Sequence, residues 1–206
     1  MMSPTVFVVD DDAAVRKSLS LLVQSVHLAV KTFESAQEFL DAYENDQPGC
    51  LVLDLRMPGL SGLELQQRLA ARGIRLPVIF ISAHGDLPSA VGAMRAGAVD
   101  FIEKPFRGQV LLDRIHQALD RDARYRAELA QRAETEALLG ALTRPERAVL
   151  DLMVAGKPYK VIARELGISY KAVEGRRARI MRKMKADSLP QLMRRLLAHQ
   201  SAAPVG

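Results

Sequence analysis

Five polar side chains stand where apolar stretches of the chain end, and their types suit phosphoryl and metal chemistry. Asp10 and Asp11 follow one apolar run, Asp54 follows a second, and Ser82 and Lys104 follow two more. Several carboxylates held together repel one another and therefore favour a divalent cation. A site made of oxygen ligands, few of them from the protein, suits Mg²⁺, which keeps several of its waters. We therefore expect a Mg²⁺ site beside Asp54.

Asp54 is the candidate reactive group. The run Cys50–Leu53 before it is continuously apolar, as in a strand buried on both faces, and Pro58-Gly59 after it must turn. An aspartate at the carboxyl end of such a strand lies where open α/β sheets bind ligands. Its carboxylate can attack a phosphorus centre to form an acyl phosphate. Mg²⁺, Lys104 and the Ser82 hydroxyl would then balance the charge on the phosphoryl oxygens.

Each of these residues also has an ordinary structural explanation. A lone aspartate after a strand is usually a turn or a helix cap, and for Asp12 that explanation is at least as good as a functional one. Ser82 by itself would be a strand-end hydroxyl, and Lys104 by itself a solvated charge. The ordered set on successive strands is what favours a common site over coincidence.

The segments around these residues alternate between strand and helix patterns. Ser35–Glu38 and Ser61–Glu64 are capping boxes that open two of the helices. The alternation predicts an α/β fold, a doubly wound five-stranded parallel sheet with helices on both faces. The predicted strands are residues 5–9, 29–33, 50–55, 77–82 and 99–103, and the predicted helices begin near residues 13, 35, 61, 86 and 106.

Charge is distributed unevenly along the 206 residues, although the net charge is only +5. Residues 1–120 hold 11 Lys or Arg against 15 Asp or Glu, whereas residues 121–206 hold 18 against 9. An acidic half joined to a basic half suggests a nucleic-acid-binding module on a regulatory or catalytic one. One cysteine excludes an internal disulfide framework, and no apolar run could span a bilayer. With no signal peptide at the amino terminus, we expect a cytoplasmic protein without a membrane partner.

The basic half has the pattern of a helix-turn-helix. Thr143–Glu146 is a capping box with a proline in the first helical turn, which predicts a helix start. A helix, a tight turn with glycine and a second, basic helix follow, and a fourth helix closes the chain. These segments are residues 159–166, 167–169, 170–184 and 188–197.

A helical linker is predicted between the halves, at residues 121–142. Residues 106–142 contain no proline, and the linker is rich in helix-forming residues of mixed charge. The fifth helix of the first half is therefore expected to continue through it. A dimeric coiled coil and a solvated spacer are both compatible with its loose apolar repeat.

Residues 3–120 resemble the receiver domain of two-component response regulators. The matching stretches are Val8–Asp12, Leu53–Gly62, Ile81–Ala83, Gly97–Phe101 and Lys104–Phe106. The resemblance implies a flavodoxin-like sheet in a receiver domain at residues 1–120. It also implies that a histidine kinase transfers a phosphoryl group to Asp54.

The same resemblance implies a role for each residue around Asp54. Asp11 would ligate Mg²⁺ directly, with Asp54 and the main-chain carbonyl of Arg56, and Asp10 would act through water. Lys104 would pair with the phosphoryl oxygens, next to what is usually a cis Lys104–Pro105 bond. Two further residues take the positions that switch the domain on phosphorylation, namely Ser82 and Phe101.

Residues 143–197 resemble the LuxR-type helix-turn-helix of the FixJ/NarL class, within a DNA-binding domain at residues 143–206. Matching stretches include Leu142–Arg147, Val154–Gly156, Lys160–Ala163, Leu166–Ser169, Ala172–Glu174 and Lys183–Ala186. By position, Lys171, Glu174 and Ala178 would face the bases of double-stranded promoter DNA. The phosphate contacts would come from Lys160, Tyr170, Arg176, Arg177 and Lys183.

The second helix of this motif departs from the family pattern at two positions. Gly175 and Arg176 stand where the family usually has a valine-like residue and a histidine or tyrosine type. A glycine in a helix interior costs about 1 kcal/mol relative to alanine. It also removes the side chain from a position that faces the groove, so a base preference carried there is lost.

These features predict a response regulator rather than an enzyme, in which phosphorylation of Asp54 switches dimerisation or frees the DNA-binding domain. The expected partners are a sensor histidine kinase, promoter DNA and a second copy of the chain, with RNA polymerase as a further candidate. An Asp-nucleophile phosphatase is disfavoured, because Arg56 stands where a second acid is needed. The remaining alternative is an adaptor that regulates DNA binding without phosphorylation.

Overall fold

The computed structural model describes residues 3–44, 47–83 and 87–200, without the side chains of residues 87–89 and 200. The chain divides into two compact units, residues 1–125 and 126–206. Helix α5, Gly108–Gly140, runs unbroken to within two residues of the end of the predicted linker, so the boundary between the units falls within a helix. No helix in the described part of the chain has the length and apolar character needed to cross a membrane.

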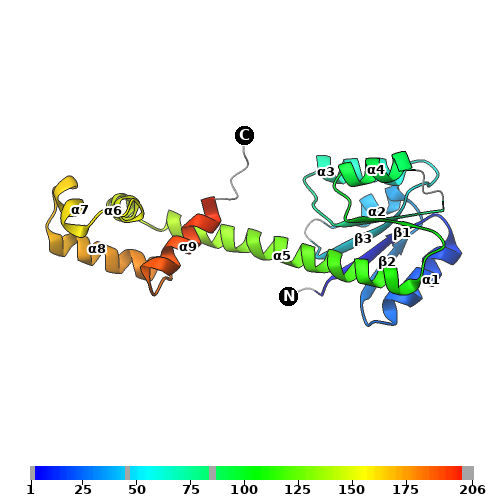
Figure 1. Cartoon of the computed structure of the whole chain (residues 1–206), viewed down its shortest axis with the longest axis horizontal. Helices are drawn as coiled ribbons and strands as arrows, with labels where there is room; N and C mark the ends of the chain where they lie inside the picture. Colours follow the sequence, from blue (N-terminus) through cyan, green and yellow to red (C-terminus); the bar gives the residue numbers. More distant parts are fainter. Residues whose placement is uncertain (1–2, 45–46, 84–86, 201–206) are drawn as a thin grey trace. The chain divides into compact units, whose positions relative to one another are not determined.

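The first unit is a five-stranded parallel sheet in the order β2-β1-β3-β4-β5, which is the flavodoxin-like order (Figure 1). This topology confirms the predicted fold. The strands are β1 Thr5–Val9, β2 Ala29–Phe33, β3 Gly49–Asp54, β4 Val78–Ser82 and β5 Asp100–Glu103. Each predicted strand is present, with ends that differ by no more than one residue.

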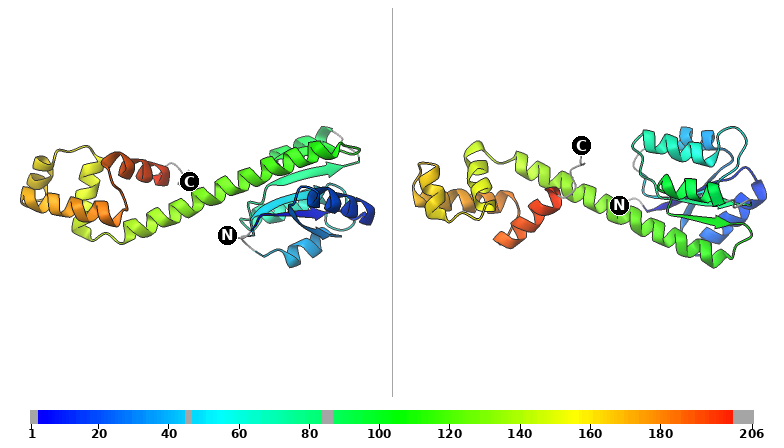
Figure 2. Two further views of the ribbon diagram at one scale, coloured as in Figure 1. Left: turned by 90° about the horizontal axis from the view of Figure 1, so that it is seen from below. Right: turned by 45° about the horizontal axis from the view of Figure 1, so that its top comes forward.

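Helices cover both faces of this sheet (Figures 1 and 2). Helices α1, Ala13–Gln24, and α5 pack on one face. The other face carries α2, α3 and α4, which span Ala36–Ala42, Gly62–Ala71 and Leu87–Arg95. The predicted start of the fourth helix at Asp86 lies outside the described residues.

Alternate residues of each strand enter two separate cores. On β3, Leu51 and Leu53 pack into the core under α2, α3 and α4, whereas Cys50 and Val52 pack into the core under α1 and α5. All six residues of β3 are buried. Burial on both faces is the reason why the run before Asp54 is continuously apolar, as expected for the central strand of a parallel sheet.

Two capping boxes were predicted in this unit, and one of them forms completely. At α3, the Ser61 hydroxyl accepts from the Glu64 N–H and the Glu64 carboxylate accepts from the Ser61 N–H. At α2, the Ser35 hydroxyl accepts from the Glu38 N–H, but the Glu38 carboxylate accepts from the N–H of Glu34 instead. The second half of that capping box was therefore wrong by one residue.

The second unit is helical. Its helices are α6 Arg144–Val154, α7 Tyr159–Glu165, α8 Tyr170–Lys183 and α9 Leu189–Gln200. Helix α9 extends three residues beyond its predicted end. The Thr143–Glu146 capping box and the Ser169 N-cap both form as predicted. The core includes Val149, Ile162, Val173, Ile180 and Leu192, and Leu138 and Leu139 at the end of α5 pack against it.

Candidate functional site

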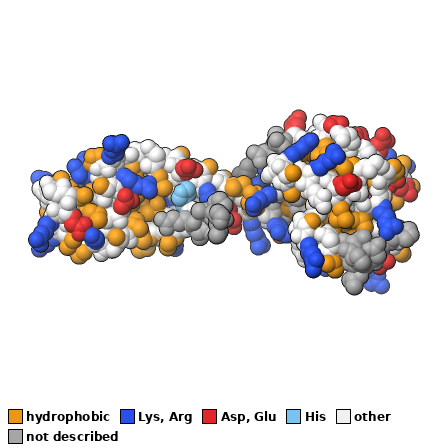
Figure 3. Space-filling view, turned by 90° about the horizontal axis from the view of Figure 1, so that it is seen from above, with side chains coloured by type: hydrophobic (Ala, Val, Ile, Leu, Met, Phe, Trp, Pro, Cys, Tyr) orange, Lys and Arg blue, Asp and Glu red, His pale blue; other side chains and the backbone are white. Residues whose placement is uncertain are grey.

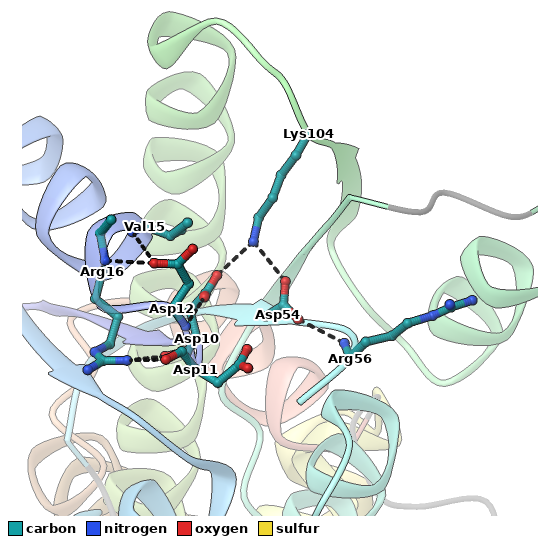
Figure 4. Close-up of polar contacts among 9 residues, drawn as sticks. Asp10, Asp11, Asp12, Val15, Arg16, Asp54, Arg56 and Lys104 are labelled. Carbon is teal, nitrogen blue, oxygen red and sulfur yellow. Dashed lines mark hydrogen bonds and ion pairs between the residues drawn. The ribbon is translucent and has the colours of Figure 1, made fainter. Parts of the chain in front are cut away.

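Two carboxylates and one ammonium meet at the carboxyl edge of the sheet (Figure 4). The Lys104 Nζ lies 2.7 Å from Asp10 Oδ2 and 2.8 Å from Asp54 Oδ1. Asp10 and Asp54 are buried, with 1% and 7% of their surface exposed. Three of the predicted residues are thus in direct contact, although Asp10 and Lys104 lie 94 positions apart in the sequence.

The strand register brings the two carboxylates together. In the parallel pairing of β1 with β3, Val9 lies opposite Leu53, so Asp10 and Asp54 end neighbouring strands at the same level. The loop after each strand then holds each carboxylate. Asp10 Oδ1 accepts from the N–H of Asp12 at 2.9 Å, and Asp54 Oδ2 accepts from the N–H of Arg56 at 2.9 Å.

Burial and pairing act in opposite directions on the charges of this cluster. Burial raises the pKa of Asp10, and the hydrogen bonds from Lys104 and from the Asp12 N–H offset this only in part. Burial alone would lower the pKa of Lys104, but its hydrogen bonds to Asp10 and Asp54 outweigh that effect and raise it. The ammonium therefore stays charged at neutral pH and compensates part of the negative charge of the two carboxylates beside it.

The loop after β1 separates the roles of three consecutive aspartates. The Asp12 carboxylate accepts from the N–H groups of Ala14 and Val15 at 2.7 and 3.3 Å, so Asp12 is the N-cap of α1. The Asp11 side chain is exposed, and Figure 4 draws no contact between it and Lys104. The structure thus agrees with the N-cap explanation that the sequence offered for Asp12.

Arg16 fixes this loop from the first turns of α1 and was missed by the sequence reasoning. Its Nη1 donates to the main-chain carbonyls of Asp10 and Asp11 at 2.8 and 2.9 Å. An arginine four residues after an acidic triplet was the available signal, but its target is backbone, which residue types do not reveal. By holding these carbonyls, Arg16 fixes the backbone from which the Asp10 and Asp11 side chains extend.

The donor set at this edge has the chemistry of a Mg²⁺ site. The Asp10, Asp11 and Asp54 carboxylates and the Arg56 carbonyl supply oxygen alone, and Lys104 compensates one of three negative charges. Among the described residues, however, no three acidic, histidine or cysteine side chains are already arranged around a single metal position. The residues fit the ion by type and charge, and the Asp11 carboxylate is exposed.

The loop after Asp54 leaves no room for a side chain at Gly62. A Cβ at Gly62 would lie 2.3 Å from the carbonyl oxygen of Asp54. The Gly62 N–H also donates to the Leu55 carbonyl at 3.1 Å. The amino terminus of α3 is therefore packed directly against the backbone of the candidate reactive residue.

The two predicted switch residues lie on the neighbouring strands. Ser82 is 2% exposed, and its carbonyl accepts from the Lys104 N–H at 2.8 Å, which joins the ends of β4 and β5. The Lys104–Pro105 bond is cis, as the resemblance led us to expect. Phe101 is half-buried and packs against the core under α2, α3 and α4. A movement of Ser82 would therefore displace Lys104, and a movement of Phe101 would change the packing of that core.

The basic helix α8 presents an exposed stripe opposite its core face. Val173 and Ile180 are buried, while the three residues predicted to face the bases, Lys171, Glu174 and Ala178, are exposed. Of the predicted phosphate contacts, Lys160 and Tyr170 are exposed and Arg176, Arg177 and Lys183 are half-buried. Lys and Arg side chains are spread over the visible face of this unit (Figure 3).

Lys183 also has contacts within the protein that the sequence reasoning did not anticipate. Its Nζ donates to the Glu146 carboxylate at 2.7 Å and to the Ala141 carbonyl at 3.0 Å. The hydrogen bond from Lys183, followed by that from the Thr143 N–H, lowers the pKa of Glu146 to about 2. Arg179 Nε lies 3.4 Å from the same carboxylate. A DNA phosphate would have to compete with Glu146 for Lys183.

Gly175 lies in open space on α8. A Cβ added there would meet no atom within 4 Å apart from the helix itself. No steric requirement of the isolated protein therefore demands glycine at this position. Because Gly175 has no side chain, the surface beside Glu174 and Ala178 has a gap at this departure from the family pattern.

Two family profiles match the chain, one for each unit. The profile described as "Response regulator receiver domain" matches residues 6–116, and the profile described as "Bacterial regulatory proteins, luxR family" matches residues 140–196. Transcriptional regulatory protein TdiR of Thauera aromatica is 48% identical over 92% of this chain and 83% of its own length. Transcriptional regulatory protein FixJ of Rhizobium meliloti is 46% identical over 96% of this chain and 97% of its own length.

Solved structures resemble the chain over both units. Response regulator StyR superposes with a TM-score of 0.87 and 45% identity, covering 95% of this chain and 99% of its own. Full-length FixJ from B. japonicum superposes with a TM-score of 0.59 and 38% identity, covering 98% of this chain and 100% of its own. The sheet with its acidic edge, the helical unit with its basic helix and these likenesses agree: the chain belongs to the FixJ/NarL class of response regulators, in which a receiver domain is joined to a LuxR-type DNA-binding domain.

Proposed function

We propose that this response regulator accepts a phosphoryl group on Asp54 from a sensor histidine kinase and, once phosphorylated, regulates transcription by binding promoter DNA. The observation that carries the proposal is the contact of Lys104 with both Asp10 and Asp54, at the edge where an open α/β sheet binds ligands. The presence of a LuxR-type unit in the same chain supports promoter DNA as the target.

Asp54 is the nucleophile in this proposal. One carboxylate oxygen of Asp54 attacks the phosphorus of a phosphohistidine, the phosphorus–nitrogen bond breaks, and its electron pair returns to the imidazole nitrogen. Lys104 already lies 2.8 Å from the Asp54 carboxylate, so its ammonium is in place for the phosphoryl oxygens. The protein thus takes part in its own phosphorylation and slow dephosphorylation, as a phosphoacceptor and not as an enzyme that turns over a substrate.

Mg²⁺ is the cofactor that suits this edge. Asp11, Asp54 and the Arg56 carbonyl would hold the ion directly, and Asp10 would hold it through water. When bound, the ion neutralises charge on the transferred phosphoryl group. Asp10 also has a second role, because its contact with Lys104 keeps the ammonium beside Asp54.

The switch is a shift between two arrangements of the receiver, residues 1–120. The aspartyl phosphate binds the active arrangement better, through Ser82 and Phe101, and so raises its population. The consequence is a homodimer, or release of the DNA-binding domain at residues 143–206, with residues 121–142 as the link. Three residues would then reach the bases, namely Lys171, Glu174 and Ala178. The phosphates would be contacted by Lys160, Tyr170, Arg176, Arg177 and Lys183. Since promoter DNA and RNA polymerase are the partners, the site of action is the cytoplasm.

Intact mass spectrometry tests the proposal directly. Wild type, Asp54→Asn and Asp12→Asn are incubated with acetyl phosphate and Mg²⁺, and light scattering is recorded on the same samples. Asp12→Asn is the matched control, because Asn remains a good N-cap for α1. We expect one phosphoryl group on wild type and on Asp12→Asn, none on Asp54→Asn, and a change to dimer that follows the adduct. An adduct on Asp54→Asn, or none on wild type, would contradict the proposal.

A further inference from the structure

Tyr159 lies outside the residues predicted to contact DNA, yet its ring touches one of them. Tyr159 is the first residue of α7, and Arg177 lies in the middle of α8. The guanidinium carbon of Arg177 lies over the Tyr159 ring, 5.9 Å from its centre. A guanidinium over an aromatic face is a favourable cation–π contact. An aromatic side chain of one helix thus holds a cation of the basic helix.

The charge of Arg177 is not compensated by an acid in the described part of the chain. The neighbouring cations Arg179 and Lys183 pair with Glu146, whereas no ion pair joins Arg177 to a described residue. Its Nε is buried and has no hydrogen-bond partner among those residues. The guanidinium is therefore held by the ring and keeps its full charge for an anion outside the protein.

The Tyr159 ring has two further neighbours besides Arg177. One side packs against the hydrophobic core of the second unit, so that Tyr159 is half-buried. The ring also lies near that of Tyr170, with a ring-centre separation of 6.4 Å. Tyr170 is 45% exposed and was predicted to contact a phosphate. Tyr159 therefore links the core to side chains on the surface where DNA is expected.

We propose that Tyr159 is a positioning residue, which holds the Arg177 guanidinium ready for a phosphate of the DNA backbone. The proposal rests on the DNA binding proposed above. A free arginine side chain loses rotamer freedom when it is ordered on a phosphate, and an arginine already ordered by a ring loses less. Of the guanidinium nitrogens only Nε is buried without a partner among the residues that the structure describes, which leaves the terminal N–H groups for the phosphate oxygens.

DNA binding by four variants of the full chain tests this role, namely Tyr159→Leu, Tyr159→Phe, Arg177→Ala and the double variant Tyr159→Leu/Arg177→Ala. Each protein is treated with acetyl phosphate and Mg²⁺, and its affinity is measured for a duplex that wild type selects from a random pool. We expect Tyr159→Leu to bind about two- to fivefold more weakly, which is the range for an exposed cation–π contact. Tyr159→Phe keeps the ring and should bind like wild type.

Two readouts separate positioning from a merely structural role. In the Arg177→Ala background, Tyr159→Leu should cause no further loss, because the side chain that it positions is absent. Removing one phosphate contact lowers the slope of log affinity against log salt by about one, so Arg177→Ala should show that decrease and Tyr159→Leu should approach it. Additive losses, or equal losses for Tyr159→Leu and Tyr159→Phe, would overturn the proposal.

Melting temperatures of all variants provide the control for folding. If Tyr159→Leu disturbs the core, Arg177→Lys gives the comparison without altering α7, because it keeps the charge and removes the planar group. We expect a similar weakening for Arg177→Lys, and affinity equal to wild type would overturn the positioning role. If the wild-type chain selects no duplex, the DNA-binding function itself is overturned, and this outcome is distinct from failure of the positioning role of Tyr159.

Discussion

Substitution of Lys104 by methionine would leave two buried carboxylates without their shared cation. Removing one partner of a buried ion pair typically costs about 3–5 kcal/mol. The Lys104 side chain retains 21% exposure, against 1% for Asp10 and 10% for Asp54, and an uncompensated Asp10 can also take up a proton. Both effects reduce the penalty, so we expect Lys104→Met to lower the stability of the receiver unit by about 2 kcal/mol at neutral pH.

This penalty should depend on pH in a defined direction. Burial already raises the pKa of Asp10 in wild type, so the contribution of Asp10 to stability is greatest below its unfolded pKa and is lost as pH rises through the folded one. Without Lys104, two of the effects that lower the pKa of Asp10 disappear and the pKa rises further. The penalty of Lys104→Met should therefore be smaller in acid, where Asp10 is neutral, and larger at neutral pH.

Hydrogen exchange measures this effect within the full chain. Amides of β1 and β3 exchange through opening of the receiver unit, and about 2 kcal/mol corresponds to about thirtyfold faster exchange. Amides of α6 provide an internal reference, and Lys17→Met, at an exposed position of α1, is the matched variant. Asp10→Asn added to Lys104→Met should restore most of the protection. Equal protection in Lys104→Met and Lys17→Met, or a penalty that does not change with pH, would refute the reasoning.

Three further outcomes are expected. Gly175→Ala should raise the melting temperature of the second unit by about 2–8 °C, because a Cβ meets no neighbour there and alanine favours the helix by about 0.5–1 kcal/mol; an unchanged or lower value would contradict this. Glu146→Gln should destabilise that unit in thermal melts at neutral pH, and the difference from wild type should vanish as pH falls from 4.5 to about 2, since Lys183 holds the pKa of Glu146 low. Asp12→Ala should destabilise α1 by about 1 kcal/mol in hydrogen exchange while the yield of phosphorylation by acetyl phosphate stays the same, and a lost adduct would show that Asp12 does more than cap the helix.

Local pattern was sufficient to predict most elements of both units. The β3 run is apolar because both of its faces are buried, and the Thr143 and Ser61 capping boxes involve residues three apart, so sequence spacing alone identifies them. At Ser35 the same spacing gave a wrong partner for the Glu38 carboxylate, which accepts from the N–H of Glu34. Which backbone N–H the Glu38 carboxylate meets depends on the path by which the chain enters α2, and residue spacing does not encode that path.

Sequence reasoning missed most contacts between distant residues, and also the local contact of Arg16 with the backbone of Asp10 and Asp11. The acidic edge was predictable because parallel strands place their carboxyl ends together. By contrast, Asp122 on α5 accepts from the N–H of Gly49 at 2.9 Å, and Lys183 pairs with Glu146 from 37 residues away. Neither pair has a fixed spacing or a shared element, so each depends on how whole helices pack. The pairing of Lys183 also shows that a basic helix contains cations with structural contacts as well as cations available for DNA.

The most direct test of the central claim is fluorescence anisotropy of a labelled duplex selected by the wild-type chain, with and without acetyl phosphate and Mg²⁺, for wild type and Asp54→Asn. If phosphorylation of Asp54 controls DNA binding, acetyl phosphate should strengthen binding of wild type and leave Asp54→Asn at the level of untreated protein. Equal binding by both proteins under both conditions would contradict that control and would favour an adaptor that regulates DNA binding without phosphorylation.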